Sequence, residues 1–474
     1  MSERNNHSFG IRHVRGQQLL TQVPQAWRSA NGRSVCIPGS HGDPSVYLNE
    51  DTMSKHILAL GSIGSGKSTL LYHVVRGILS WNSPNDRYIF FDAKGDYIRQ
   101  FRNPNTSVSI GYDGEYRSEA WNLFADIMDS PAAAPDMELL RQIATTLFKR
   151  QIDASNNPTF VFGARDLFVG LVKIFINRCQ RAGQTSWQYM NNAELKKFFM
   201  ENARDGQVIS NMVSEDPSLA WLTTYLLAPT SATTQSYLAP LQTMMNDVFV
   251  GCFARNGSFS IRQFMRSNTG KRELFLEYDP EKGCIIDTVY TALLDLAIKE
   301  AIGRQVSGRN VFFVLDEFPM IPPLTYISQA LQFGRSLGVK VIAAIQNTSQ
   351  MMQKYGEDEA MNIISGFSTV LAFRLFDQRS RDIISGRHGK RIVRINCASS
   401  RYNEQDIEEM RDMDVVADWD VTCLQTGQCV VSPYMGDPFL FFPDMYPIGL
   451  PAPAPVTTQP TGGSNKHIRI IRGG

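Results

Sequence analysis

Residues 56–69 read HILALGSIGSGKST, an apolar run followed by the pattern G-x-x-x-x-G-K-[ST] between Gly61 and Ser68. An apolar helical periodicity continues over 70–78. Phosphate oxygens need several converging N–H donors, and only small residues let the backbone wrap that closely. The N-terminus of the following helix adds partial positive charge. Because strand, loop and helix stand in the order that this chemistry requires, the stretch predicts a nucleotide phosphate-binding loop rather than a chance glycine-rich turn.

The loop also predicts roles for individual residues. Lys67 is expected to hold the β- and γ-phosphates of ATP, and Ser68 is expected to ligate Mg²⁺. The seven histidines and seven cysteines show no pair at metal-ligand spacing, so any metal must arrive with a ligand. The residues predicted to bind the nucleotide are Gly61, Gly64, Ser65, Gly66, Lys67, Ser68 and Thr69.

A second apolar run, VFFVLDEF at 311–318, ends in two acids. Burying two carboxylates after such a run would cost free energy, so they are expected to stand at the end of the strand. There Asp316 would complete the Mg²⁺ shell, and Glu317 would polarise the attacking water as general base. An acidic helix N-cap is the other interpretation. A phosphate-binding loop needs an acidic partner of this kind, so the pair predicts ATP hydrolysis.

Three further features have two interpretations each. Gln346 ends the run VIAAIQ and either senses the γ-phosphate or is an ordinary polar residue at a strand end. Arg335, in FGRSLG, is too far along to reach its own phosphates comfortably; it is either an arginine finger for a neighbouring subunit or a solvated helix residue. The segment 92–96, DAKGD, follows a predicted strand and either lines the site or forms a surface turn.

Length and composition set the class of protein. The chain has 474 residues with 47 Lys and Arg against 46 Asp and Glu, a formal net charge of +1. With 43% hydrophobic and 20% charged residues, it is predicted to be globular, and small disulfide-stapled and fibrous classes are excluded. The apolar cluster at 167–172 is far shorter than the roughly 18 to 20 residues of a membrane span. The polar N-terminus lacks a secretory signal, which predicts a cytoplasmic protein.

Short β-branched or aromatic runs alternate with helical periodicities and predict an α/β core with a parallel sheet. The stretch 126–265 breaks this rhythm and is predicted to be an all-α domain inserted between two halves of the sheet domain, 51–125 and 266–445. The segment 446–474 is rich in Pro, Gly, Ser and Thr and is predicted to be a flexible tail. The predicted core strands are 56–60, 88–92, 273–278, 311–315, 341–345 and 369–373, followed by strand-like runs at 428–432 and 439–442.

One local charge excess stands out in this nearly neutral chain. Residues 379–394, RSRDIISGRHGKRIVR, carry six cations against Asp382, a sum of +5. Such a patch either neutralises phosphates along DNA or is a solvated face. Trp187 and Trp221 in the helical block are expected to pack in the core rather than stack on bases. The candidate DNA contacts in the patch are Arg387, Lys390 and Arg391.

The order of the motifs resembles the cytoplasmic ATPase of the type IV secretion coupling proteins, the TraD and TrwB type, from about residue 10 to 445. In that family a RecA-like P-loop domain with a small all-α domain assembles as a hexamer around a channel. By motif position, Lys67 and Ser68 match the Walker A pair, and Asp316 and Glu317 match the Walker B pair. The motifs that carry the resemblance are GSIGSGKST, FFDAKGDY, WNLF at 121–124, LEYDP at 277–280, VLDEFP, FGRSLG, AIQNTSQMMQKYG at 344–356 and ISGRHGK.

The resemblance further implies that Gln346 is the family's glutamine after the next strand and that Arg335 reaches a neighbouring subunit's site. It implies an ATP-driven DNA translocase that links the relaxosome to the secretion channel in conjugation, with DNA, relaxase and channel proteins as partners. Family members usually begin with two transmembrane helices, whereas residues 1–50 here resemble only the juxtamembrane segment. The anchor is therefore expected to be absent, on another chain or removed, with the protein cytoplasmic or peripheral at the inner membrane face.

Two other functions are consistent with the same residues. The chain also resembles the HerA and FtsK motor ATPases, which implies a DNA-processing or defence translocase. It could instead be a docking receptor for secreted protein cargo, with nucleotide binding as a switch and the helical block and the acidic stretch 404–420 as its working surfaces. Stimulation of ATP turnover by DNA or by protein cargo would separate a motor from a receptor.

Overall fold

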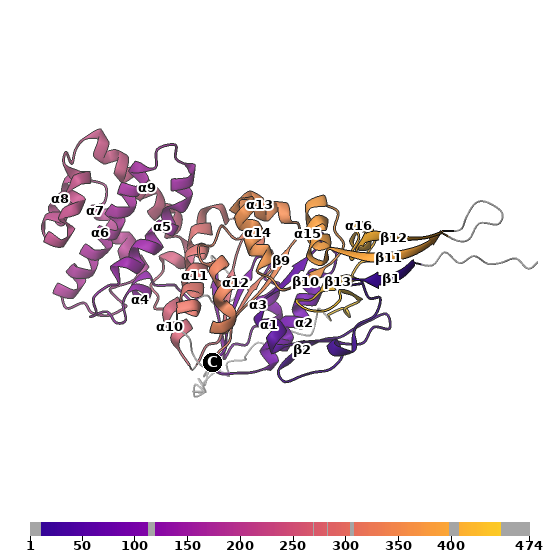
Figure 1. Ribbon diagram of the computed structural model, residues 1–474. Helices are drawn as coiled ribbons and strands as arrows, with labels where there is room; N and C mark the ends of the chain where they lie inside the picture. The colour runs from indigo at the N-terminus through magenta and orange to yellow at the C-terminus, as the bar shows by residue number, and fades with distance from the viewer. Residues whose placement is uncertain are drawn as a thin grey trace, which may run out of the picture.

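A large sheet covered by helices and a separate block of helices make up the structure (Figure 1). The structure is a computed structural model that describes residues 11–111, 119–268, 270–281, 283–303, 308–397 and 407–446. The block of helices is inserted between strands β6 and β7 of the sheet. The predicted fold class, an α/β domain with an all-α insertion, is thereby confirmed.

The central sheet has nine strands. Every pairing from β10 to β6 is parallel, whereas β13 and β14 add antiparallel strands at one edge. All the strand-like runs expected from the sequence lie in this sheet, and β6 is an additional strand. In sheet order the strands are β14 (Phe439–Phe441), β13 (Cys429–Ser432), β10 (Thr369–Ala372), β4 (Ile57–Leu60), β9 (Val339–Ile345), β8 (Val311–Leu315), β5 (Arg87–Asp92), β7 (Glu273–Glu277) and β6 (Ser107–Gly111).

Two separate hydrophobic cores cover the two faces of the sheet. Side chains alternate along a strand, so Ile57 and Ala59 of β4 pack with α2, while Leu58 and Leu60 face the core that contains α11. Because both faces are buried, the strands read as continuous apolar runs. The sheet domain's helices include α1 (Glu50–Ser54), α2 (Lys67–Ser80), α3 (Asp96–Phe101), α11 (Gly283–Gly303), α12 (Ile327–Phe333), α13 (Thr348–Tyr355), α14 (Glu357–Ser365), α15 (Gln378–His388) and α16 (Asp418–Thr422).

The all-α block is built around the 23-residue helix α6. Its first long helix, α5, begins where the Asp136 carboxylate accepts a hydrogen bond from the backbone N–H of Leu139, a typical N-cap. Trp187 packs partly buried against this core, as expected, whereas Trp221 is 38% exposed beside Arg141. The helices of the block are α5 (Met137–Ala154), α6 (Thr159–Arg181), α7 (Asn192–Asn202), α8 (Gly206–Ser214) and α9 (Ala232–Val248), with the 3₁₀ segment η2 (Pro217–Leu226).

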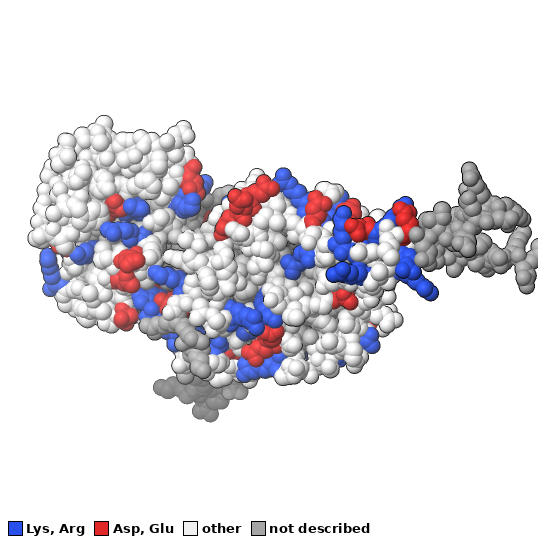
Figure 2. All heavy atoms as spheres, in the orientation of Figure 1, with Lys and Arg blue, Asp and Glu red and all other residues white. Residues whose placement is uncertain are grey.

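Charged side chains are distributed unevenly over these parts. In the view of Figure 2, Lys and Arg gather over the end that carries β11 and β12, whereas the upper face of the helical block shows few charges. Residues 217–246, which form η2 and most of α9, contain no Asp, Glu, Lys, Arg or His. The upper face of the helical block in Figure 2 therefore presents a largely uncharged surface.

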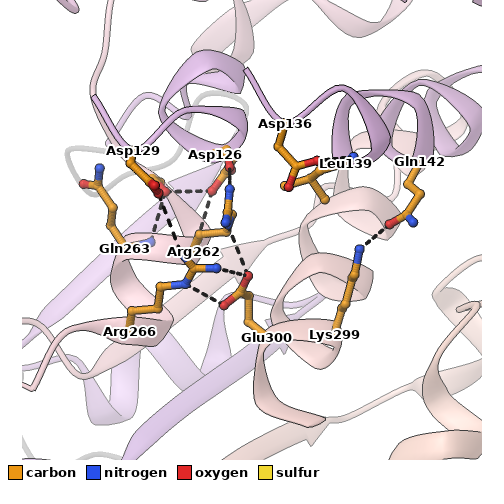
Figure 3. A network of polar contacts seen from close by, with 11 residues as sticks. Asp126, Asp129, Asp136, Leu139, Gln142, Arg262, Gln263, Arg266, Lys299 and Glu300 are labelled. Carbon is orange, nitrogen blue, oxygen red and sulfur yellow. Dashed lines mark hydrogen bonds and ion pairs between the residues drawn. The ribbon is translucent and has the colours of Figure 1, made fainter. Parts of the chain in front are cut away.

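A polar cluster joins the helical block to the sheet domain where the chain enters the block by α4 (Leu123–Ile127) and leaves it by α10 (Ile261–Arg266). Glu300 of α11 accepts hydrogen bonds from Arg262 Nε at 3.2 Å and Arg266 Nε at 2.8 Å (Figure 3). Buried Asp126 accepts from the backbone N–H of Arg262 at 2.9 Å and from Ser260 Oγ at 2.7 Å. Helix α11 therefore holds α10 directly and α4 through Arg262.

The same helix also holds the segment that follows β8. The Asp295 carboxylate accepts hydrogen bonds from the backbone N–H groups of Thr325 at 2.8 Å and Tyr326 at 3.4 Å, at the start of α12. Glu317 is followed by the 3₁₀ turn η4 (Phe318–Met320) and then by this segment. Asp295 and Glu300 thus attach one helix to the segment before α12 and to α10.

The N-terminal segment is integrated into the sheet domain. Strand β1 (Ile11–Arg15) pairs with β11 (Lys390–Cys397), which pairs with β12 (Ile407–Asp414), and this three-stranded ribbon projects at the end opposite the helical block (Figure 1). The hairpin of β2 (Ser34–Ile37) and β3 (Val46–Asn49) packs on α2. Among the described residues, no helix has both the length and the apolar character to cross a membrane.

The predicted flexible tail falls almost entirely outside the described residues, which end at 446. Tyr446 itself is 5% exposed and packs edge-on against Tyr72 of α2, with ring centroids 5.6 Å apart. The sheet domain therefore includes Tyr446, one residue beyond the predicted boundary.

Candidate active site

The predicted phosphate-binding loop joins β4 to α2 at the carboxyl edge of the sheet. Gly64 and Gly66 have φ angles of 71° and 112°, in the left-handed region that favours glycine. Gly66 also faces the backbone so closely that an added Cβ would lie 3.1 Å from the Cα of Gly427. The glycines of the motif therefore allow the close backbone curvature that a phosphate cradle needs.

Lys67 lies at the centre of this loop and is 7% exposed. Its ammonium donates to the carbonyl oxygens of Gly61 at 2.6 Å and Ser62 at 2.9 Å. Burial lowers the pKa of Lys67, although the negative charges of Glu317 and Asp316 act in the opposite direction. The side chain is thus held inside the curve of the loop, where phosphate oxygens would bind.

Asp316 lies directly beyond the end of β8 and faces the loop. Ser68 Oγ donates to Asp316 Oδ2 at 3.4 Å, while Asp316 Oδ1 is buried without a hydrogen-bond partner. Burial and the neighbouring charge of Glu317 raise the pKa of Asp316 to about 6. A hard cation prefers such oxygen ligands, and an orphaned carboxylate oxygen beside a serine hydroxyl fits Mg²⁺. Ser68 and Asp316 are therefore suited to hold the metal together.

Glu317 occupies a strained position between two side chains. Its φ angle is 60°, an unusual left-handed conformation for a residue with a side chain. Lys94 Nζ donates to Glu317 Oε1 at 3.0 Å, and Gln346 Nε2 donates to Glu317 Oε2 at 2.7 Å. The carboxylate predicted to act as general base is therefore fixed over the phosphate-binding loop.

A cavity of about 890 Å³ lies over these groups. Its walls include the loop from Ile63 to Thr69, Lys94, Glu317, Gln346, and Lys354 of α13. Clefts of roughly 300 to 1,000 Å³ are usual for small-molecule ligands, so a nucleotide fits this volume. The structure thus brings the predicted nucleotide and metal residues to one cavity, except Gly61 and Asp316, which do not line it but contact the lining residues Lys67 and Ser68.

Arg335 lies away from that cavity. It belongs to η5 (Gly334–Leu337), just before β9, and its guanidinium pairs with Asp51 at 3.1 Å with 59% of the side chain exposed. Strands β4 and β9 are parallel, and Leu60 pairs with Ile345 at their carboxyl ends. Arg335 therefore lies at the amino edge of the sheet, opposite the phosphate-binding loop of its own chain.

The basic stretch 379–394 does not form one continuous surface. Arg387 is turned inward: its guanidinium donates to the carbonyl of Ser368 at 2.8 Å and to Ser432 Oγ at 3.2 Å, and burial lowers its pKa. Arg381 pairs with Asp418 of α16. These contacts count against Arg387 as a DNA contact, because DNA would have to displace its internal partners.

Lys390 and Arg391 lie on β11 beside the acidic strand β12. Lys390 is exposed and Arg391 is half-buried. In the ladder, Lys390 is opposite Asp414 and Ile392 is opposite Asp412, so part of the acidic stretch 404–420 is adjacent to the basic one. Residues 404–406 lie outside the described residues. Lys390 and Arg391 remain the candidate DNA contacts of this surface.

Lys94 is a cavity residue whose place the sequence left open. The segment 92–96 suggested either a site loop or a surface turn, and no spacing rule connects Lys94 with Glu317, 223 positions later. Their contact depends on the pairing of β5 with β8, which places the ends of these two strands side by side. Only the DAKGD motif at a strand end gave a signal for it.

A family model and a known coupling protein match the sequence of this chain. Residues 43–418 match the sequence model of a family described as the type IV secretion-system coupling protein DNA-binding domain. The coupling protein TraD of Escherichia coli (strain K12) is 21% identical to this chain over 344 residues. That alignment covers 70% of this chain and 43% of TraD, so the chain spans less than half the length of this relative.

Solved structures of the bacterial conjugative coupling protein TrwB share the fold. The unbound TrwBdeltaN70 form overlays with a TM-score of 0.70 at 19% identity, covering 93% of this chain and 95% of that one. TrwB in complex with a non-hydrolysable ATP analogue gives a TM-score of 0.69 at 18% identity, covering 94% and 97%. These similarities confirm the predicted RecA-like fold with its all-α domain.

Proposed function

Because this chain belongs to the family of type IV secretion-system coupling proteins, we propose that it is an ATPase that drives DNA from a relaxosome into a secretion channel during conjugation. The observation that carries this proposal is the pair of carboxylates at the end of β8. Asp316 has an orphaned oxygen beside Ser68, and Glu317 lies in the same cavity as the phosphate-binding loop. One carboxylate is suited to a metal and the other to a water molecule.

The proposed chemistry follows from the positions of these groups. Lys67 would bind the β- and γ-phosphates, while Ser68 and Asp316 would hold Mg²⁺, which neutralises phosphate charge when bound. Glu317 would accept a proton from the attacking water, and Gln346 would orient the carboxylate through its 2.7 Å hydrogen bond. Each residue acts from a strand end or from the loop, so all of them share the rigid edge of the sheet.

ATP turnover measured with and without single- and double-stranded DNA tests the proposed function. A DNA motor is expected to hydrolyse ATP faster when DNA is present. Protein prepared in the same way with Lys67→Ala controls for contaminating ATPases. A wild-type chain that hydrolyses no ATP under any of these conditions would contradict the proposal.

One observation favours a second role, the docking of protein cargo. The charge-free stretch 217–246 on the helical block leaves Leu227 82% exposed, which suits contact with a protein more than contact with DNA phosphates. A receptor is expected to change its ATP turnover when protein cargo binds and to ignore DNA. From its family membership we further propose that the protein acts at the inner face of the bacterial membrane. Its proposed protein partners are relaxase proteins and channel components.

Assembly into a ring of identical subunits, a hexamer in this family, is proposed to complete the active site. Arg335 lies at the sheet edge opposite its own loop and is mostly exposed, so it can reach phosphates only in an adjacent copy. Arg335→Ala should reduce turnover by about 10³-fold, the lower range for an arginine finger. When mixed with Lys67→Ala chains, it should regain turnover, because some mixed interfaces then contain both an intact loop and an intact arginine.

ATP turnover at several mixing ratios checks this prediction. Lys55→Ala is the matched control. Lys55 pairs with the same Asp51 at 2.6 Å, so this substitution also removes one positive charge from the same place. It should retain nearly all turnover. Mixtures that co-assemble but stay inactive at every ratio would show that Arg335 does not act between subunits.

DNA is proposed to contact Lys390 and Arg391 on β11. Lys390→Gln with Arg391→Gln should weaken binding to every DNA sequence about equally and reduce the salt slope by about 2 units at most, since two phosphate contacts are removed. ATP binding should persist. Fluorescence titrations with unrelated DNA sequences at several salt concentrations provide the measurement.

The double variant Lys149→Gln with Lys197→Gln removes the same charge from exposed positions of the helical block. Equal weakening in that control would mean that the location on β11 is wrong. Arg387→Gln is left out of the DNA variant, because the loss of its contacts with Ser368 and Ser432 should lower the free energy of unfolding.

A further inference from the structure

The loop that carries Lys94 is held in a fixed shape by hydrogen bonds and forms part of the candidate active site. The carboxylate of Asp92, 2% exposed, accepts hydrogen bonds from the backbone N–H groups of Asp96 at 3.1 Å and Ile98 at 2.8 Å. Gly95 closes the turn with a φ angle of 68°. A buried carboxylate that organises the backbone in this way fixes where Lys94 begins, so the segment is not a loose surface turn.

The side chain of Lys94 extends from this fixed loop into the nucleotide cavity. Its ammonium is 3.0 Å from Glu317 Oε1, and 53% of the side chain is exposed. Although burial alone would lower the pKa of Lys94, the hydrogen bond and charge of Glu317 raise it, so the ammonium stays charged. A charged, partly exposed lysine on a flexible stem can change partners without any movement of the backbone.

Both oxygens of the Glu317 carboxylate already accept a hydrogen bond from a side chain, one from Lys94 and one from Gln346. While Lys94 stays on Oε1, an attacking water must share that oxygen with the ammonium. A γ-phosphate close to Glu317 would add like-charge repulsion unless a cation stood between them. Lys94 is placed to be that cation.

We propose that Lys94 is a second phosphate-binding lysine, whose ammonium leaves Glu317 for the γ-phosphate of bound ATP and so frees Glu317 to act as general base. This inference rests on the proposed ATPase function. The lysine keeps its proton throughout. In the hydrolysis step, the water oxygen bonds to the γ-phosphorus, the bond to the bridging oxygen of ADP breaks, and the water proton passes to Glu317. Lys94 thereby makes the base available only when a γ-phosphate is present.

Nucleotide binding tests this role separately from turnover. Lys94→Met keeps nearly the length of the side chain and removes its charge. A lost charge-assisted hydrogen bond corresponds to about tenfold or more in affinity. Calorimetry with Mg²⁺ should show at least about tenfold weaker binding of a non-hydrolysable ATP analogue. Binding of ADP, which lacks the γ-phosphate, should be nearly unchanged. Lys94→Arg should restore binding of the analogue.

Arg99→Met is the matched control, because Arg99 pairs with Asp96 on the same segment at 3.2 Å and does not line the cavity. It should bind both nucleotides as the wild-type chain does. Equal weakening for the analogue and ADP in Lys94→Met would mean that Lys94 only shapes the loop, and unchanged binding of the analogue would also overturn the proposal. Wild-type protein that binds the analogue but hydrolyses no ATP would contradict the ATPase function itself and leave the binding comparison intact.

Discussion

Lys67→Ala is expected to abolish ATP turnover, with a decrease of about 10²- to 10³-fold or more. The ammonium of Lys67 is the cation held inside the curve of the phosphate-binding loop, by hydrogen bonds to Gly61 and Ser62. No other side chain of the loop carries a positive charge. Phosphate charge that develops during hydrolysis would therefore lose its main partner.

Steady-state turnover and thermal unfolding of the Lys67→Ala chain provide the measurement together. The fold should persist, because the backbone of the loop is shaped by glycines and because burial lowers the pKa of Lys67, which means that its charge is not favoured by the core. Normal turnover in this variant would refute the ATPase assignment. Lost turnover together with an unfolded chain would instead make Lys67 a structural residue.

Glu317→Gln should have a different effect of similar size, a decrease in turnover of about 10²- to 10⁴-fold with ATP still bound. The amide keeps the shape of the side chain and can still accept from Gln346, but it cannot take a proton from water. The metal ligands Ser68 and Asp316 are untouched. ATP should therefore accumulate on the protein unhydrolysed.

Retention of radiolabelled ATP after rapid gel filtration measures this trapping. Asp316→Asn serves as the contrasting variant, because it changes the proposed metal ligand and should weaken binding of ATP with Mg²⁺. If Glu317→Gln loses ATP as quickly as Asp316→Asn, then Glu317 is needed for nucleotide binding and is not simply the base.

The strands of the central sheet were predictable where helices bury both of their faces, because such strands read as continuous apolar runs. Strand β6 escaped prediction because its sequence, SVSIG, alternates serine with apolar residues. The ribbon of β11 and β12 escaped because its basic and acidic stretches looked like two independent charge runs. Their relation appears only in the pairing, where Lys390 lies opposite Asp414.

The core of the active site was predictable from two motifs. Parallel strands end at one edge of a sheet, so the loop after β4 and the acids after β8 had to meet there. The spacing of motifs along the sequence does not give the order of the strands within the sheet. That order decides where Lys94 and Arg335 lie. Lys94 meets Glu317 because β5 is next to β8, and Arg335 lies at the far edge because η5 comes just before β9.

Helix α11 couples two parts of the molecule mechanically. Asp295 accepts a hydrogen bond from the segment after η4. Glu300, five residues further along the helix, accepts hydrogen bonds from both arginines of α10. Five residues of helix span only about 7.5 Å, too short a length to bend appreciably. A displacement of the segment before α12 would therefore be transmitted along α11 to α10, where the chain leaves the all-α block.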